Sequence, residues 1–310
     1  MSGNSLDRLR VLTSFHFFRT RDFDDIVERL SINNVPPDIF ADSGAFSAWT
    51  QGAEVTVDDY TEWLHKWKHY FSVYCSLDVI DDPVATEVNQ RALESNGLLP
   101  LPVWHIRSDR KHFEALCEEY RYVAVGGMVG TRWTRLMPKL TWAVRRGREL
   151  GTVLHGLGVS APKVISSLPL FSVDSTTWGV GFRLGSVSVW DGQRLNKVTL
   201  GKHAKWQQHA AAVSRLGFSP ARFANREAGR HEQAALSAVS TVLQEQHARR
   251  TLGLVPLPEG DKPEVKPGQD GLRLYLADLS IDNFSNAAEG LRIYLAGPLD
   301  SYYDIRAWAG

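Results

Sequence analysis

Short apolar runs bounded by turn residues recur along the chain as far as Asp174. They are rich in β-branched and aromatic residues, a composition typical of buried β-strands. We therefore predict seven strands, at Val11–Phe18, Asp38–Asp42, Ser72–Asp78, Leu99–His105, Tyr122–Gly127, Thr152–Gly158 and Leu170–Asp174.

Segments with helical periodicity separate these runs. After the acidic pair Asp58-Asp59, large apolar side chains recur three and four residues apart, which is typical of an amphipathic helix. Similar patterns predict helices at Val57–Tyr70, Pro83–Ser95, Asp109–Glu119, Trp133–Leu150 and Ala161–Ser167. This alternation indicates an α/β fold with parallel strands. Seven clear units and a less clear eighth favour a (β/α)8 TIM-type barrel, and a doubly wound open sheet is the alternative.

The pattern changes after Asp174. Residues 187–190 and 197–200 resemble two strands on either side of an Asp-Gly turn, which predicts a β-hairpin insertion. A long helix is predicted over Glu227–Arg250. The barrel domain is therefore expected to cover residues 1–253.

The C-terminal part has a different composition. Residues 254–271 are rich in Pro, Gly and charged residues, which predicts a linker or an exposed loop. Residues 271–277 and 290–296 are similar to each other and are interpreted as two similar strands. Residues 272–310 are expected to form a small C-terminal extension, to which the sequence assigns no function.

The composition limits the possible functions. The chain has 310 residues, of which 43% are hydrophobic, enough for one barrel of about 250 residues with an appendage. Basic and acidic residues number 35 each, which excludes a protein that coats nucleic acid all over but permits a local basic face. The two cysteines, Cys75 and Cys117, form no disulfide framework or CxxC pair. With no signal peptide or membrane span recognised, we expect a cytoplasmic protein.

Candidate chemistry lies where the predicted strands end. Asp42, Asp78 and Asp174 are at or near such ends, and a barrel gathers them at one mouth. Carboxylates that converge in this way are typical of glycosyl transfer, with Asp174 as a candidate nucleophile and Asp42 as a candidate general acid and base. The alternative for both residues is a structural cap of the following turn.

Four residues are candidates for binding a flat base. Asp78 precedes a separate helix start at Asp82-Pro83, so it has no capping task, and its carboxylate can accept hydrogen bonds from a guanine-like edge. Gly126-Gly127 allows a ligand to approach the backbone, although a tight turn explains it equally well. His105 can contact a base edge, or it can be a structural hydrogen-bonding residue.

Basic residues gather between positions 183 and 230, where nine Lys or Arg and two acidic residues give a net charge of +7. This region is a candidate surface for binding phosphates, and a solvated helix and loop face is the alternative. The residues assigned to nucleic-acid binding are Arg183, Arg194, Lys197, Lys202 and Lys205.

Four motifs, in order, resemble the tRNA-guanine transglycosylase superfamily. The segment Asp42-Ser-Gly-Ala-Phe46 is similar to its acid/base loop, and Leu77-Asp78 is similar to the site of its base-reading aspartate. The turn at Gly126-Gly127 is similar to its base-binding turn. The segment from His155 to Asp174 is similar to the stretch that ends in its nucleophile.

The resemblance covers roughly residues 40–200 and implies a TIM barrel. It implies that Asp174 is the nucleophile and Asp42 the general acid and base. The implied base-binding residues are Asp78, Gly126, Gly127, His105, Ser43, Phe46 and Met128. Phe46 and Met128 are candidates to sandwich the base, and both are equally compatible with a place in the core.

The chain also departs from the family. The tRNA enzymes of the superfamily carry a zinc site of three cysteines and a histidine after the nucleophile, but no cysteine follows Cys117 here. We therefore expect no cofactor. In this respect the chain resembles a branch of the superfamily, mostly from phages and mobile elements, that exchanges guanine in DNA for a 7-deazaguanine.

The predicted function is thus a DNA-guanine transglycosylase whose partners are DNA and a free 7-deazaguanine, such as the 7-cyano form, with protection from restriction as its expected role. Three alternatives stay open. One is the same exchange on tRNA, and another is a non-catalytic nucleic-acid-binding module. The third is a barrel glycoside hydrolase in which Trp49, Trp63 and Trp104 stack on sugars.

Overall fold

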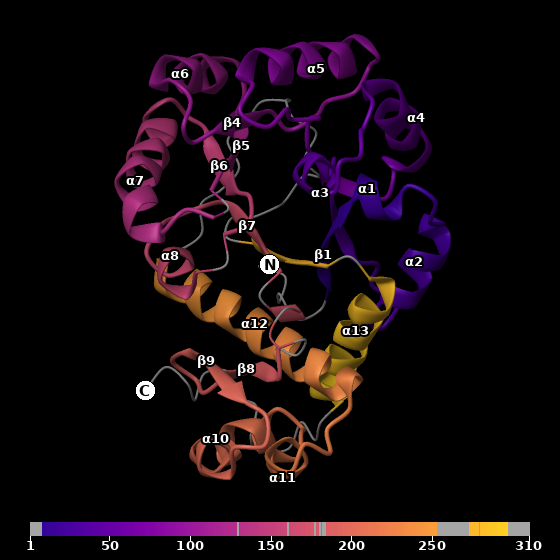
Figure 1. Ribbon diagram of the computed structural model, residues 1–310, viewed down its shortest axis with the longest axis vertical. Coiled ribbons are helices and arrows are strands. Elements are labelled where there is room, and N and C mark those ends of the chain that lie inside the picture. Colours follow the sequence, from indigo (N-terminus) through magenta and orange to yellow (C-terminus); the bar gives the residue numbers. More distant parts are fainter. Residues whose placement is uncertain are drawn as a thin grey trace.

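The computed structural model describes most of the chain. The described residues are 8–128, 130–159, 161–176, 178–179, 181, 184–252, 273–278 and 280–296, without the side chains of 290 and 293–296. Figure 1 shows strands at the centre of the molecule with helices around them.

The eight central strands form one parallel sheet in the order β3-β2-β1-β10-β7-β6-β5-β4. Apart from β10, which lies between β1 and β7, neighbours in the sheet are consecutive strands, whereas a doubly wound sheet reverses its order at a switch point. The parallel α/β prediction is therefore confirmed. The strands are β1 (Arg10–Ser14), β2 (Asp38–Asp42), β3 (Phe71–Tyr74), β4 (Val103–His105), β5 (Tyr122–Gly126), β6 (Val153–Gly156), β7 (Ser172–Ser175) and β10 (Arg273–Ala277).

The sheet curls, but its ladder is not continuous between the outer strands β3 and β4. One isolated bridge, between Cys75 and Leu101, joins the segments that follow β3 and precede β4. The backbone N–H of Leu101 donates to the carbonyl of Tyr74 at 2.8 Å, and that of Ser76 donates to the carbonyl of Leu101 at 2.9 Å. The structure is thus a curled parallel sheet that resembles a TIM barrel without a closed ladder.

Helices cover the outer side of the sheet (Figure 1). Asp82 starts α5 by accepting a hydrogen bond from the N–H of Ala85 at 2.9 Å, with Pro83 in the first turn, as its sequence predicts. The helices are α1 (Phe15–Phe18), α2 (Phe23–Leu30), α3 (Ala45–Thr50), α4 (Val57–Trp67), α5 (Pro83–Ser95), α6 (Arg110–Glu119), α7 (Trp133–Glu149), α8 (Pro162–Ile165), α10 (His203–Arg215), α11 (Pro220–Ala224), α12 (Arg230–Leu252) and α13 (Ile281–Ala296).

Alternate residues of each strand face two separate cores. The larger core lies between the sheet and the helices and includes Val11, Ile39 and Val123. The smaller core lies on the opposite, inner face, where every second strand residue points. Its members are Leu12, Phe40, Val73, Cys75, Leu101, Val103, Tyr122, Ala124, Val153, Phe171, Tyr275 and Ala277.

Residues 273–277, expected in a small C-terminal extension, instead supply the strand β10 between β1 and β7. Leu274 and Leu276 pack in the outer core, while Tyr275 and Ala277 pack in the inner one. The expectation of a second, similar strand at 290–296 is wrong, because these residues belong to α13. The two segments have similar sequences but different structures. Residues 273–277 are buried within the sheet, and this burial favours the strand conformation there.

The hairpin after β7 is confirmed, as β8 (Ser186–Trp190) and β9 (Leu195–Thr199) pair antiparallel. Its loop is the four residues 191–194 rather than a two-residue turn, because Trp190 pairs with Leu195. The N–H of Ser188 donates to the Ser237 hydroxyl of α12 at 3.2 Å. Figure 1 shows the hairpin, α10 and α11 grouped beyond α12.

The first strand of the chain, β1, differs from its prediction. The strand expected over Val11–Phe18 ends at Ser14, and α1 begins at Phe15. Phe15 turns into the outer core, where its ring contacts Tyr60 and Trp63 with centroids 5.5 and 5.4 Å apart. The aromatic run therefore packs as a helical turn, although its composition is typical of a strand.

The place of β10 in the sheet predicts the effect of a core substitution. Leu276 is fully buried, so Leu276→Ala should lower the free energy of unfolding by about 2–5 kcal/mol in urea titrations. The control Leu184→Ala removes a leucine that is 70% exposed and should change it by less than about 0.5 kcal/mol. Equal, small effects of the two substitutions would contradict the position of β10.

Candidate active site at the carboxyl ends of the strands

The strands bring several predicted site residues to one end of the sheet. Asp42, His105 and Gly126 each come two residues after a member of the inner core, so they share its face. His105 pairs directly with Gly126 across β4 and β5. Asp78 follows β3 and Asp174 lies in β7, so the candidate residues gather where parallel strands end.

The electrostatics of Asp42 show that the three carboxylates share one environment. Burial, together with the negative charges of Asp78 and Asp174, raises the pKa of Asp42 to about 7, against hydrogen bonds from the backbone that lower it. The same three carboxylates contribute to raising the pKa of the buried Cys75 thiol, although burial is the main cause. Asp42 is therefore a carboxyl group that can both donate and accept a proton near neutral pH.

The turn after β2 requires glycine at position 44. Gly44 has φ +73°, and a Cβ there would lie 2.1 Å from the Ser14 hydroxyl oxygen. Its N–H donates to Oδ2 of Asp42 at 2.9 Å. Asp42 thus caps this turn, which is the structural role given above as the alternative to catalysis. The same hydrogen bond orients its carboxyl group at the mouth.

Asp78 lies between two other predicted site residues. The Ser43 hydroxyl donates to Oδ1 of Asp78 at 3.4 Å, and His105 Nε2 lies 3.2 Å from Oδ2. Ser43 is fully buried and His105 is nearly so. The structure therefore brings Ser43, Asp78 and His105 together, and it shows His105 as a hydrogen-bonding partner of Asp78.

Asp174 is almost buried and accepts two hydrogen bonds at one oxygen. The N–H of Gly158 donates to Oδ1 at 2.7 Å, and His155 Nε2 lies 3.3 Å from the same atom. His155 was present in a sequence motif, but no role was predicted for it. The available signal was its position two residues after Val153, which places it on the inner face.

Gly126, the last residue of β5, and Gly127 after it lie beside His105. A Cβ on Gly126 would lie 3.3 Å from Cδ2 of His105, and Gly127 has φ +72°. Glycine at 127 therefore serves a tight turn, which agrees with its structural interpretation.

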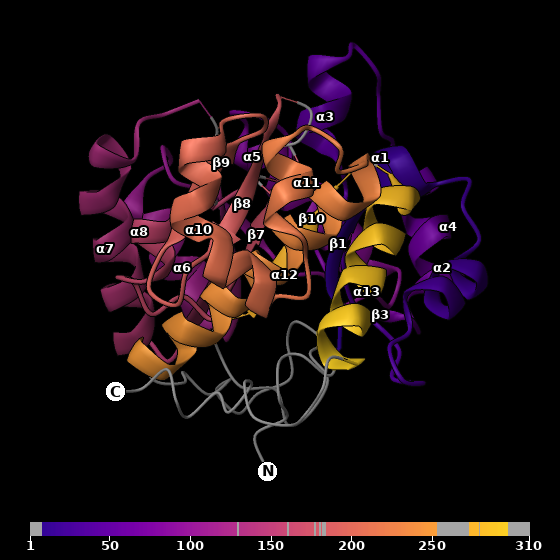
Figure 2. The ribbon, with the colours of Figure 1, turned by 90° about the horizontal axis from the view of Figure 1, so that it is seen from below.

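The two residues expected to sandwich a base lie in different surroundings. Met128 is buried in the outer core, whereas Phe46 of α3 is 43% exposed. Trp49, on the same helix, is 63% exposed, and its ring centroid is 6.2 Å from that of Phe46. Figure 2 shows α3 projecting at one edge of the molecule.

The predicted nucleic-acid-binding residues lie on the hairpin and α10. Arg194, Lys197, Lys202 and Lys205 are all exposed, and none forms an ion pair with another described residue. Arg183 lies outside the described residues. These side chains are thus available to an anionic partner.

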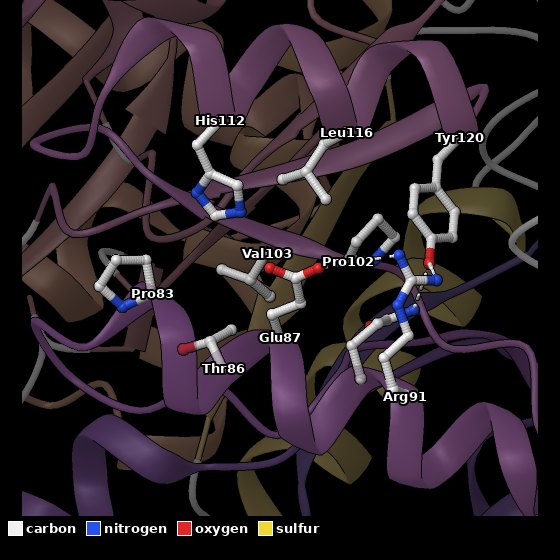
Figure 3. A pocket seen from close by; sticks show the side chains of 10 residues that line it. Pro83, Thr86, Glu87, Arg91, Pro102, Val103, His112, Leu116 and Tyr120 are labelled. Atoms are coloured by element: carbon white, nitrogen blue, oxygen red, sulfur yellow. Dashed lines mark hydrogen bonds and ion pairs between the residues drawn. The ribbon is translucent and has the colours of Figure 1, made fainter.

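A small pocket lies elsewhere, between α5 and α6. Figure 3 shows Glu87, Arg91 and His112 among the side chains that line it, and Arg91 donates to the Tyr120 hydroxyl at 3.0 Å. None of the three mouth carboxylates lines this pocket. It therefore contributes nothing to the candidate active site.

The described residues show neither a metal-binding group nor a membrane-spanning helix. Within the described residues, no group of three or more His, Cys, Asp or Glu can hold a metal ion, and no helix is long and apolar enough to cross a membrane. Both cysteines are buried and precede Asp174, so the three-cysteine zinc set does not fit this chain.

No protein-family model matches the chain, and a search of curated proteins finds no relative.

The raised pKa of Asp42 predicts a dependence of stability on pH. Its pKa is 3.8 ordinarily and about 7 in the folded protein, so the folded state holds a proton that the unfolded chain loses between these values. The resulting stabilisation is present below the lower value and is lost as pH rises through the higher one. Asn cannot ionise, so Asp42→Asn should gain stability relative to the wild type as pH rises.

The measurement is the free energy of unfolding of both proteins from about pH 4 to pH 8, with an expected relative gain of about 1–4 kcal/mol. Glu62→Gln, on the exposed side of α4, is the control and should show no such gain. Parallel pH curves for Asp42→Asn and the wild type would show that Asp42 titrates as an ordinary carboxyl group.

Proposed function

We propose that this protein is a base-exchanging glycosyltransferase that replaces guanine in DNA with a 7-deazaguanine. The observation that carries the proposal is the pair Asp42 and Asp174, which interact electrostatically at one mouth but have different surroundings. Asp42 has a pKa near 7, whereas the Asp174 carboxylate accepts hydrogen bonds from Gly158 and His155. Two carboxyl groups in unlike environments can divide the roles of proton donor and nucleophile.

In the first step, an oxygen of Asp174 attacks C1′ of the target deoxyguanosine. The bond between C1′ and N9 breaks, guanine leaves with the electron pair, and protonated Asp42 supplies the proton. A glycosyl ester of Asp174 remains. The backbone N–H groups at Gly126-Gly127 are the proposed donors to the carbonyl oxygen of the leaving base.

The second step reverses the first with a different base. N9 of the incoming 7-deazaguanine attacks C1′, the ester bond breaks, and its electron pair returns to the Asp174 carboxylate. Asp42, now ionised, accepts the N9 proton and returns to its starting state. Asp78, fixed by Ser43 and His105, is the proposed acceptor for the N–H groups of the guanine-like edge.

The proposed substrate must present an unstacked nucleotide. A base in a duplex cannot reach such a site, so it must be flipped out or single-stranded, at a cost of a few kcal/mol. The exposed cations Arg194, Lys197, Lys202 and Lys205 are proposed to bind the phosphates. In this proposal the curled sheet is the TIM-type barrel of the superfamily, interrupted between β3 and β4.

DNA is preferred over tRNA because the chain lacks the cysteines of the tRNA enzymes' zinc site. The hydrolase alternative loses support, since Trp63 and Trp104 are buried in the outer core and cannot stack on a sugar. Only Trp49 of its three aromatic residues is exposed. The base-exchange proposal therefore accounts for more of the site.

The test is the incorporation of labelled guanine into DNA and tRNA, compared between the wild type and Asp174→Asn. The wild type should label DNA, and Asp174→Asn should lose at least about 1,000-fold in rate, because the amide is a poor nucleophile. Binding of single-stranded DNA should be unchanged in the variant. Asp25→Asn, a control at an exposed position, should match the wild type.

Labelling of tRNA alone would replace DNA with tRNA as the substrate. Release of free sugar without base incorporation would favour the hydrolase, and DNA binding without any exchange would favour the binding module. An Asp174→Asn protein with the wild-type rate would remove Asp174 from the mechanism.

A further inference from the structure

A chain of buried polar groups leads to Asp174 from inside the sheet. The hydroxyl groups of Tyr122 and Ser172 are 2.5 Å apart, and Ser172 Oγ lies 2.6 Å from His155 Nδ1. His155 Nε2 then lies 3.3 Å from Oδ1 of Asp174. Tyr122, Ser172 and His155 are each at most 1% exposed, so water does not compete for these hydrogen bonds.

One assignment of donors satisfies every member of this chain. Tyr122 donates to Ser172, Ser172 donates to Nδ1 of a neutral His155, and the imidazole N–H is then on Nε2, directed at Asp174. The reverse assignment would place the N–H on Nδ1. It would leave the Nε2 lone pair facing an oxygen of the Asp174 carboxylate, which is repulsive.

Packing holds the imidazole in this position. The ring of His155 stacks on Phe40, with centroids 4.4 Å apart and an interplanar angle of 26°. Both rings are fully buried. A ring fixed by stacking on one face and by a hydrogen bond at Nδ1 has little freedom to turn its Nε2 away from Asp174.

The hydrogen bonds of Asp174 distinguish its two oxygens. Oδ1 accepts from Gly158 and faces His155 Nε2, and no hydrogen bond from another described residue reaches Oδ2. Oδ2 is therefore the oxygen available to an electrophilic carbon. Ser172 itself is fully buried, so this set of Ser, His and Asp does not present the serine as a nucleophile.

We propose that His155 is a positioning residue for Asp174, set in its tautomer by Ser172, and this inference rests on the proposed role of Asp174 as nucleophile. The Nε2–H holds Oδ1 so that Oδ2 attacks C1′. In the second step the C1′–O bond breaks and its electron pair returns to the carboxylate, whose charge the same N–H stabilises. His155 keeps its proton throughout, and the N9 proton goes to Asp42.

Three variants separate the donor from the packing. His155→Gln places an amide N–H near the position of Nε2, whereas His155→Phe keeps a ring to stack on Phe40 without a donor. Ser172→Ala removes the group that fixes the tautomer. His65→Gln, at an exposed site on α4, is the matched control.

The readout is single-turnover base exchange, measured together with binding of single-stranded DNA. His155→Phe should slow exchange about 10- to 100-fold at unchanged DNA affinity, as expected for loss of a group that orients a reacting side chain. His155→Gln should recover most of that loss, and Ser172→Ala should be intermediate. A wild-type rate in His155→Phe, or equal losses in the Phe and Gln variants, would overturn the inference.

A second readout does not require activity. In protein labelled with 15N at histidine, NMR should show His155 as the neutral tautomer with its N–H on Nε2. This resonance should shift in Asp174→Asn but not in Asp25→Asn. A proton on Nδ1, or no shift in Asp174→Asn, would overturn the inference, whereas absence of exchange by the wild type on both DNA and tRNA would overturn the proposed function.

Discussion

The carboxyl groups of Asp42, Asp78 and Asp174 lie within electrostatic reach of each other at a partly buried mouth. This arrangement costs the folded protein stability, and no ion pair with Lys or Arg among the described residues offsets the cost. Burial disfavours the charge on Asp42, and the charges of Asp78 and Asp174 add to that effect. Among the described residues, no Lys or Arg forms an ion pair with any of the three. Stability alone would favour a compensating cation, so this arrangement is typical of a functional site.

The amino ends of the strands show the opposite arrangement. There, Arg10 donates to Glu245 of α12 at 2.9 Å, and Arg273 lies 3.7 Å from Asp38. These buried charges are paired, although burial still raises the pKa of Glu245. The same sheet thus has paired opposite charges at the amino ends of its strands and neighbouring carboxyl groups at the carboxyl ends. In parallel barrels, the amino ends contribute to stability and the carboxyl ends carry the functional residues.

Much of this fold follows from local sequence. The bounds of β2 and α5 match their predictions because a buried apolar run and an Asp-Pro helix start are strong local signals. Residues 271–277 were expected to form a strand, but the place of β10 in the sheet was not predicted. A segment rich in Pro and Gly separates it from the other strands in the sequence, and its pairing with β1 and β7 depends on tertiary structure. The same limit applies to α1, where packing of Phe15 outweighs strand propensity.

The candidate site was predictable where chemistry and strand ends coincide, as at Asp42, Asp78 and Asp174. His155 was missed because its role depends on Ser172 and Asp174 in the neighbouring strand, which no local pattern reveals. Met128 shows the converse case, since the sequence was equally compatible with base binding and with a place in the core, and the residue packs into the outer core. Sequence patterns therefore located the carboxyl groups of the candidate site better than the residues that contact or surround them.

The coupling of the carboxyl groups is tested most directly by NMR titration of the Asp42 side chain, using 13C-labelled aspartate in the wild type and in Asp174→Asn. The account predicts that Asp42 titrates near pH 7 in the wild type and at lower pH once the charge at position 174 is removed. An Asp42 that titrates near its ordinary value of 3.8 in both proteins would contradict it.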